Sequence, residues 1–156
     1  AHGARVAMTS SSDEKLSVAR SLGADITVNY RSHPDWPAEL LRQTGNKGAD
    51  IIMETGGQDT LAQTMEAAAI NGQIVIIGVS PGTTPAVSDY VSFIRKNITI
   101  RGIANGNHAM FVDLLNAVEA AKIETVVSKT FGFNEAPDAF AYFAAAQHVG
   151  RVMIEV

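Results

Sequence analysis

Hydroxyl-bearing side chains gather just after the first predicted strand. Ser10, Ser11 and Ser12 follow a strand predicted at residues 4–9, and Lys15 comes one helical turn later. In a dinucleotide-binding fold, an acidic residue at this point accepts hydrogen bonds from the adenosine ribose, whereas hydroxyls with a cation accommodate a 2′-phosphate. These residues therefore favour NADP over NAD. Ser11 and Ser12 would also suit a helix cap, with Lys15 in solvent, and both roles can hold together.

Small residues end three of the later predicted strands. Glu54 and Thr55 lead into Gly56 and Gly57, a pair that lets a ligand approach the backbone closely or simply makes a turn. Two more strand ends are of the same kind, namely Gly78, Val79 and Ser80 after the fourth strand and residues 102–106 after the fifth. A tight turn explains each group alone. The three together favour a flat ligand lying along the carboxyl edge of the sheet.

Other side chains are weaker candidates for chemistry. Tyr30 and Arg31 end the second strand and could stack on, or pair with, an adenosine phosphate, although a Tyr here also commonly borders a core. Glu54 could be a general base, but a carboxylate at a strand end is more often a cap or a loop anchor. The sequence contains no P-loop, no GxGxxG and no supported Ser/His/Asp constellation. We therefore assign no catalytic residue to this chain.

The composition argues against several classes of function. The 156 residues carry 12 basic and 16 acidic side chains, and a net charge of −4 does not suit a nucleic-acid-binding domain. No apolar run approaches the roughly 20 residues of a membrane helix and no leader is recognisable, so we expect a cytoplasmic protein without a membrane partner. The chain lacks Cys and its four His form no ligand pair, so we predict no metal site within it.

Short apolar strands alternate with amphipathic helices along the chain, which is typical of an α/β fold. Five strands are mostly apolar without alternation, as strands buried on both faces are, and they are predicted at residues 4–9, 25–30, 49–55, 73–80 and 98–104. We therefore predict a doubly wound parallel sheet covered by helices on both faces. Two further runs, at residues 125–131 and 151–156, alternate more and could lie elsewhere.

Five helices are predicted from their ends and apolar stripes. The first has capping-box spacing from Ser11 to Glu14 and is ended by Gly23. The others are predicted from Pro37 to about residue 45, at residues 58–70 and 108–122, and from about Asn134 onward. The largest loop signal lies at residues 80–88, directly after a strand. Residues 1–3 are typical of the last turn of a helix, so we interpret the chain as a segment of a longer protein, although processing would explain this start equally.

Several segments, taken in order, resemble one protein family. They are GARVAMTSSSDEKLSVARSLGAD at residues 3–25, then ITVNYR, ADIIMETGG, GQIVIIGVS and the closing GRVMIEV. Together they resemble the medium-chain dehydrogenase/reductase superfamily, and more narrowly its zinc-type alcohol dehydrogenase and quinone oxidoreductase branch. The resemblance implies a truncated NAD(P)-binding Rossmann domain at residues 1–123. It also implies that residues 124–156 return to a catalytic domain that this chain does not contain.

The resemblance also implies roles for individual residues. Ser10, Ser11 and Lys15 would hold the adenosine 2′-phosphate of NADP, with Tyr30 nearby and with NAD as the alternative cofactor. The residues implied around the rest of the cofactor are Gly78, Val79, Ser80, Ala104 and Asn105 beside the nicotinamide and Arg151 near the pyrophosphate. In zinc-dependent members the metal ligands belong to the region that this chain lacks. Zinc in the parent protein therefore stays open.

The first Rossmann strand and its Gly-rich loop are missing from the matched pattern. The Rossmann order 3-2-1-4-5-6 puts that strand at the centre of the sheet, so strands two and four lose their common neighbour. A separate piece of the same protein, direct pairing of the flanking strands, or a partner chain would satisfy their backbone groups, and we favour the separate piece. Residues 98–104 resemble the edge through which family members join into dimers, so we predict a homodimer.

Two functions follow as expectations. In the first, the parent protein is an enzyme that transfers a hydride between NADP(H) and a small alcohol, aldehyde, ketone or quinone. The absent domain would bind that substrate, so the chain alone is predicted to be inactive. In the second, the chain is a non-catalytic module that binds a nucleotide or a partner. The coding sequence upstream of Ala1 would separate the two.

Overall fold

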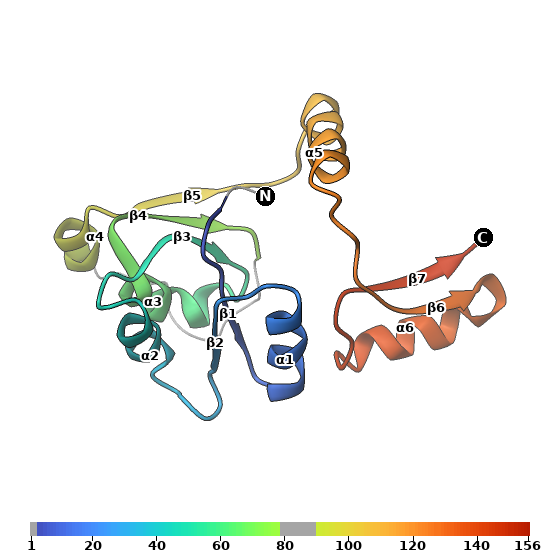
Figure 1. Ribbon diagram of the computed structural model, residues 1–156, viewed down its shortest axis with the longest axis horizontal. Helices are drawn as coiled ribbons and strands as arrows, with labels where there is room; N and C mark the ends of the chain where they lie inside the picture. The colour runs from blue at the N-terminus through green and yellow to red at the C-terminus, as the bar shows by residue number, and fades with distance from the viewer. Residues whose placement is uncertain (1–2, 79–89) are drawn as a thin grey trace. The chain divides into compact units, whose positions relative to one another are not determined.

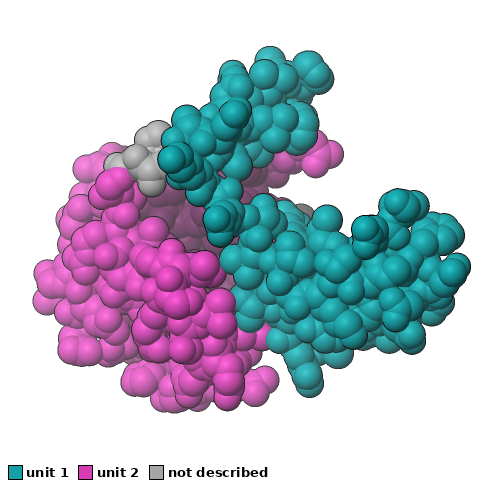
Figure 2. All heavy atoms as spheres, turned by 45° about the vertical axis from the view of Figure 1, so that its right-hand side comes forward, with its two compact units in different colours: residues 1, 106–156 teal, residues 2–105 magenta. Residues whose placement is uncertain are grey.

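The computed structural model describes residues 3–78 and 90–156, and strands alternate with helices throughout them (Figure 1). The described residues up to 105 form one compact unit, and residues 106–156 form a second (Figure 2). The predicted boundary between residues 123 and 124 stays a prediction. The loop predicted at residues 80–88 lies outside the described residues.

The first unit contains five strands and four helices among its described residues. In chain order they are β1 (Ala7–Ser10), α1 (Asp13–Ser21), β2 (Ile26–Asn29), α2 (Trp36–Gln43), β3 (Ala49–Glu54), α3 (Gln58–Ala67), β4 (Ala68–Ile76), α4 (Tyr90–Lys96) and β5 (Thr99–Gly102). The second unit follows the same alternation, with α5 (His108–Ala120), β6 (Val127–Gly132), the 3-10 helix η1 (Phe133–Glu135), α6 (Ala136–Ala144) and β7 (Arg151–Glu155). The predicted α/β fold is therefore confirmed.

All paired strands of the described residues run parallel. β1 pairs with β2, β4 lies between β3 and β5, and β6 pairs with β7. This is the doubly wound order with its central strand left out, because β1 and β3 would be the two neighbours of that strand. Within the described residues β1 and β3 do not pair with each other, so each keeps one unpaired edge. Direct pairing of the flanking strands is therefore not the arrangement in this structure.

Side-chain packing joins the two sheets of the first unit. Ile26 and Val28 of β2 form a buried cluster with Leu40 of α2, and Ala49 and Ile52 of β3 pack against it. A second cluster surrounds Ile74 of β4 and also contacts Ile52. Apolar residues recurring on strands and on one helix face thus produce a continuous core. This core fixes the strand ends that carry the candidate site.

The start of α1 differs by one residue from the predicted capping box. Ser12, rather than Ser11, is the N-cap, and its Oγ accepts the Lys15 N–H at 3.3 Å. Leu16 is only 2% exposed and anchors the helix to the strands. Gly23 follows the helix with φ of 101°, a backbone conformation that favours glycine. The predicted end of this helix is confirmed.

The boundary between α3 and β4 comes earlier than predicted. The apolar pattern predicts a helix to Ile70, whereas α3 ends at Ala67 and Ala68 already pairs with Ala49. Lys96, at the end of α4, fixes this boundary because its Nζ donates to the carbonyl oxygens of Met65, Glu66 and Ala68 at 3.2, 2.5 and 2.9 Å. Helix α4 itself was not predicted. The helix end therefore depends on the ammonium group of Lys96, which lies about thirty residues further along the chain.

Replacing Lys96 with methionine is expected to lower the free energy of unfolding by about 1–2 kcal/mol, since charged hydrogen bonds to the carbonyls that end α3 would be lost. Burial lowers the pKa of this ammonium, while the nearby Glu66 opposes that shift. Urea denaturation checks the change. Lys47→Met is the control, because the exposed pair between Lys47 and Asp50 contributes about 0.5 kcal/mol or less. Equal effects of the two substitutions would contradict the capping role.

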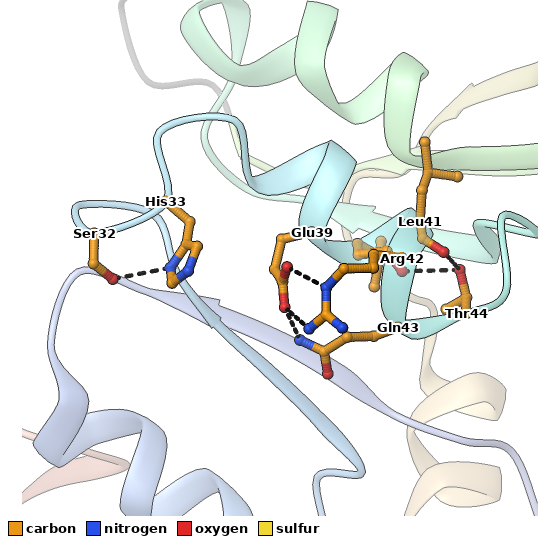
Figure 3. A network of polar contacts seen from close by, with 8 residues as sticks. Ser32, His33, Glu39, Leu41, Arg42, Gln43 and Thr44 are labelled. Atoms are coloured by element: carbon orange, nitrogen blue, oxygen red, sulfur yellow. Dashed lines mark hydrogen bonds and ion pairs between the residues drawn. The ribbon is translucent and has the colours of Figure 1, made fainter.

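The surface of α2 carries a network of polar contacts (Figure 3). Glu39 accepts hydrogen bonds from Arg42 Nε and Nη2 at 2.8 and 2.6 Å, and from Gln43 Nε2 at 2.6 Å. The bonds from Arg42 and then Gln43 lower the pKa of the Glu39 carboxyl to about 2. Thr44 ends the helix, because its Oγ1 donates to the carbonyl oxygens of Leu40 and Leu41. The carboxylate therefore stays ionised at neutral and mildly acidic pH.

The second unit packs α6 against the β6–β7 pair. Phe131 of β6 is buried, and its ring centroid lies 5.7 Å from that of Tyr142 on α6. Lys129 Nζ lies 4.3 Å from the Phe131 centroid, and the His148 ring stacks on Phe143 at 4.9 Å. The Phe131–Tyr142 contact therefore joins β6 to α6, and the His148–Phe143 stack joins α6 to the segment that follows it.

Candidate functional site

The carboxyl ends of β1 and β2 lie side by side. Ser10, the last residue of β1, is opposite Asn29 in the register, and the Tyr30 N–H donates to the Ser10 carbonyl oxygen at 3.0 Å. Tyr30 is 44% exposed, so its ring is available to a ligand. Parallel pairing thus brings two of the predicted residues, Ser10 and Tyr30, to one edge.

The turn from β1 into α1 places more polar residues at the same edge, among them Ser11, Ser12, Glu14 and Lys15. Ser10 Oγ accepts the Ser12 N–H at 3.3 Å, and Ser12 Oγ donates to Glu14 Oε2 at 2.5 Å. This bond from Ser12 lowers the pKa of the Glu14 carboxyl. Ser11 and Lys15 are half-buried beside this turn. Ser12 is therefore the cap, and Ser10, Ser11 and Lys15 stay together as the predicted group at the strand end.

Two residues that the sequence interpretation missed complete this edge. Asn29 Nδ2 donates to Asp13 Oδ1 at 2.8 Å, and Asn29 Oδ1 accepts the Arg31 N–H at 3.0 Å. Asp13 is the first residue of α1 and Arg31 follows Tyr30 in the loop after β2. The helix start therefore carries hydroxyl groups and a lysine, which suit a phosphate, together with two carboxylates, Asp13 and Glu14, that accept hydrogen bonds from Asn29 and Ser12.

Glu54 closes the end of β3 as an internal anchor. Its Oε1 accepts the N–H groups of Gly56 and Gly57 at 2.6 and 3.1 Å and the Thr60 hydroxyl at 2.7 Å, and its Oε2 accepts the Thr64 hydroxyl. Glu54 is only 4% exposed. Both carboxylate oxygens are thus occupied by donors of the protein itself. The geometry favours the anchor over the base.

The ends of β4 and β5 carry the residues implied beside the nicotinamide. The Gly78 N–H donates to the Glu54 carbonyl oxygen at 3.2 Å, and a Cβ on Gly78 would lie 2.1 Å from the Thr55 carbonyl oxygen, so only glycine fits. Ala104 and Asn105 are exposed after β5. Val79 and Ser80 lie outside the described residues.

Arg151 is the first residue of β7 and belongs to the second unit, where its N–H donates to the Val126 carbonyl oxygen at 2.8 Å. Its approach to a pyrophosphate stays a prediction. No group of three His, Asp or Glu side chains among the described residues could hold a metal ion, and the whole chain lacks Cys. In the same part of the chain no helix is long and apolar enough to span a bilayer.

Comparison with known proteins gives consistent matches. Residues 1–120 match the family model described as zinc-binding dehydrogenase. Over its whole length the chain is 39% identical to a zinc-type alcohol dehydrogenase-like protein of Schizosaccharomyces pombe, covering 46% of that protein. A 2-haloacrylate reductase of Burkholderia sp. is 30% identical over 97% of the chain and 48% of the reductase.

A solved structure supports the same likeness. The crystal structure of a NAD-dependent alcohol dehydrogenase superposes on 99% of the chain with a TM-score of 0.85 and 34% identity, covering 44% of that protein. The chain therefore spans about half the length of the curated relatives it matches, 46% and 48% in the two cases above.

Proposed function

Because the chain belongs to the zinc-binding dehydrogenase family, we propose that it is the dinucleotide-binding part of an oxidoreductase and that it binds NADP. In this proposal Ser10, Ser11 and Lys15 hold the adenosine 2′-phosphate, with Tyr30 nearby. The observation that carries the proposal is the gathering of these hydroxyls and the lysine at the carboxyl end of β1, beside the start of α1. The related alcohol dehydrogenase that is named NAD-dependent makes NAD the alternative cofactor.

The proposed reaction is hydride transfer between NADP(H) and a small alcohol, aldehyde, ketone or quinone. When the cofactor is bound, its nicotinamide supplies the hydride for reduction of a carbonyl compound or quinone and accepts it for oxidation of an alcohol. The relatives named alcohol dehydrogenase-like and haloacrylate reductase support this class of reaction. For the rest of the cofactor the proposal keeps the residues that the family resemblance implies, which are Gly78, Val79, Ser80, Ala104 and Asn105 for the nicotinamide and Arg151 for the pyrophosphate. The substrate binds to a part of the protein outside this chain, and the chain alone is inactive.

Zinc does not fit the residues that the structure describes, because they hold no cluster of three possible ligands and the chain has no Cys. No step of the proposal therefore uses zinc. We place the protein in the cytoplasm as a homodimer joined through β5, whose described pairing is with β4 alone, leaving its outer edge for a partner.

Titration of the full-length protein with NADPH and with NADH at one salt concentration tests the cofactor. A site for the 2′-phosphate is expected to favour NADPH by a factor of about ten or more, which is about 1.4 kcal/mol. Lys15→Ala should remove most of this preference, whereas Lys47→Ala, on the loop before β3, should keep it. Equal affinities for the two cofactors in the unaltered protein would contradict the assignment. Absence of hydride transfer by the full-length protein would favour a non-catalytic module instead.

A further inference from the structure

We propose that Asn29 is a positioning residue that sets the preference of this site for NADPH over NADH. The inference rests on the proposed function and deepens it, because it concerns the selectivity of the same site. Asn29 ends β2 directly before Tyr30 and lies opposite Ser10 in the strand register. It therefore stands between the two walls of the site, which are the turn into α1 and the loop after β2.

Both ends of the Asn29 amide are occupied by protein groups. Its Nδ2 donates to Asp13 Oδ1 at 2.8 Å, and its Oδ1 accepts the Arg31 N–H at 3.0 Å. The orientation of the amide is fixed by chemistry, because a carboxylate can only accept and a backbone N–H can only donate. Asn29 thus joins Asp13, the first residue of α1, to the loop that carries Tyr30 and Arg31. Its role is therefore to position these residues.

The backbone of Asn29 strengthens the loop side of this connection. Its carbonyl oxygen accepts the His33 N–H at 2.9 Å and the Ser32 hydroxyl at 3.2 Å. The loop after β2 therefore turns back so that two of its residues, Ser32 and His33, bind the carbonyl oxygen of Asn29. Any change that moves Asn29 moves Tyr30 and Arg31 relative to Ser10.

The hydrogen bond from Asn29 to Asp13 also controls where a negative charge lies in the proposed phosphate site. Asp13 lies two residues before Lys15, at the helix start where the 2′-phosphate is proposed to bind. A carboxylate turned toward that phosphate would repel it, and a carboxylate near an adenosine ribose is the arrangement that suits the hydroxyls of NAD. Donation from Asn29 holds one oxygen of the Asp13 carboxylate against the end of β2. Asn29 therefore keeps the site selective for a phosphate.

A charge exchange between the two residues tests the proposal. Asn29→Asp places two carboxylates against each other, so Asp13 must turn away from β2 and the ratio of the Kd values for NADH and NADPH should fall about tenfold. The double variant Asn29→Asp with Asp13→Asn keeps the net charge and restores one donor and one acceptor, with their order reversed. Its ratio should return to within about threefold of that of the unaltered protein.

Both dissociation constants are measured in the full-length protein by titration with NADPH and with NADH. Their ratio does not depend on the folded fraction of a variant, since both cofactors bind the same folded molecules. Asn97→Asp is the matched control, because the Asn97 Nδ2 also donates to a side chain, Asn71 Oδ1, at 2.6 Å but stands after α4. The control should leave the ratio unchanged.

The possible results separate the role of Asn29 from the choice of cofactor. An unaltered preference in Asn29→Asp, or a loss that the double variant does not restore, would overturn the role of Asn29 while leaving the proposed function in place. Equal affinities for NADPH and NADH in the unaltered protein would overturn the proposed cofactor, and the role of Asn29 with it. Loss in the single variant and recovery in the double variant would support the proposal.

Discussion

Replacing Glu54 with alanine is expected to lower the free energy of unfolding by about 4 kcal/mol. The substitution leaves the N–H groups of Gly56 and Gly57 and the hydroxyls of Thr60 and Thr64 without their shared acceptor. Each buried donor that loses its partner costs about 1–3 kcal/mol, and entering water would recover part of the sum. Urea denaturation followed by the fluorescence of Trp36, the only Trp, measures the change. The Trp36 Nε1 donates to Gln63 on α3, so the probe reports on the affected helix.

Two further variants make the result for Glu54 specific. Glu54→Gln keeps one acceptor oxygen but turns an NH₂ group toward a hydroxyl or an N–H, so its loss should be intermediate. Glu119→Ala on α5 removes an exposed carboxylate, and its effect should stay within about 0.5 kcal/mol. A loss below about 1 kcal/mol for Glu54→Ala would show that the carboxylate does not hold the turn and the helix.

Gly150→Ala is expected to destabilise the second unit by about 4 kcal/mol. Gly150 has φ of 84°, where a side chain is strained, and an added Cβ would lie 2.2 Å from the Val126 carbonyl oxygen. A left-handed conformation costs a residue other than glycine about 1–3 kcal/mol, and overpacking adds a similar amount. The same carbonyl oxygen accepts the Arg151 N–H at 2.8 Å, so the first link between β6 and β7 must shift.

Hydrogen exchange of the β7 amides measures this effect directly, because Arg151 and its neighbours should lose protection first. Gly102→Ala is the control: Gly102 ends β5, has no positive φ, and an added Cβ meets nothing within 4 Å. Its effect should stay below about 1 kcal/mol. Normal protection of β7 in Gly150→Ala would mean that the backbone relaxes around the new methyl group.

Much of the fold follows from the sequence because its signals are local. The apolar runs predict the parallel strands, and Ser12, Leu16 and Gly23 supply the cap, the buried contact and the end of α1. The end of α3 was wrong by three residues, since the apolar pattern continues to Ile70 while Lys96 binds the carbonyl groups that end the helix. A contact between residues about thirty positions apart leaves no periodic signal.

The candidate site was predictable in its residue types but not in its connections. Ser10 ends β1 and Lys15 lies in the first turn of α1, and their role toward a cofactor stays a prediction. Glu54 with Thr60 and Thr64 has a local signal, because the two hydroxyls lie on one face of α3. The hydrogen bond between Asn29 on β2 and Asp13 on α1 joins two residues that lie 16 positions apart in the sequence. It exists only because β1 and β2 pair in register, so the sequence alone does not indicate it.

The unpaired edges of β1 and β3 restrict what could ever lie against them. Within the described residues each of these strands has one hydrogen-bonded neighbour, so a row of peptide groups faces outward from each. A polypeptide that docks there must be extended and must offer its own N–H groups, so proline is unsuitable in its middle. Without such a polypeptide, the unpaired donors and acceptors of β1 and β3 can pair with the strands of other molecules. The protein would then form fibrous aggregates, and more of it would aggregate at higher protein concentration.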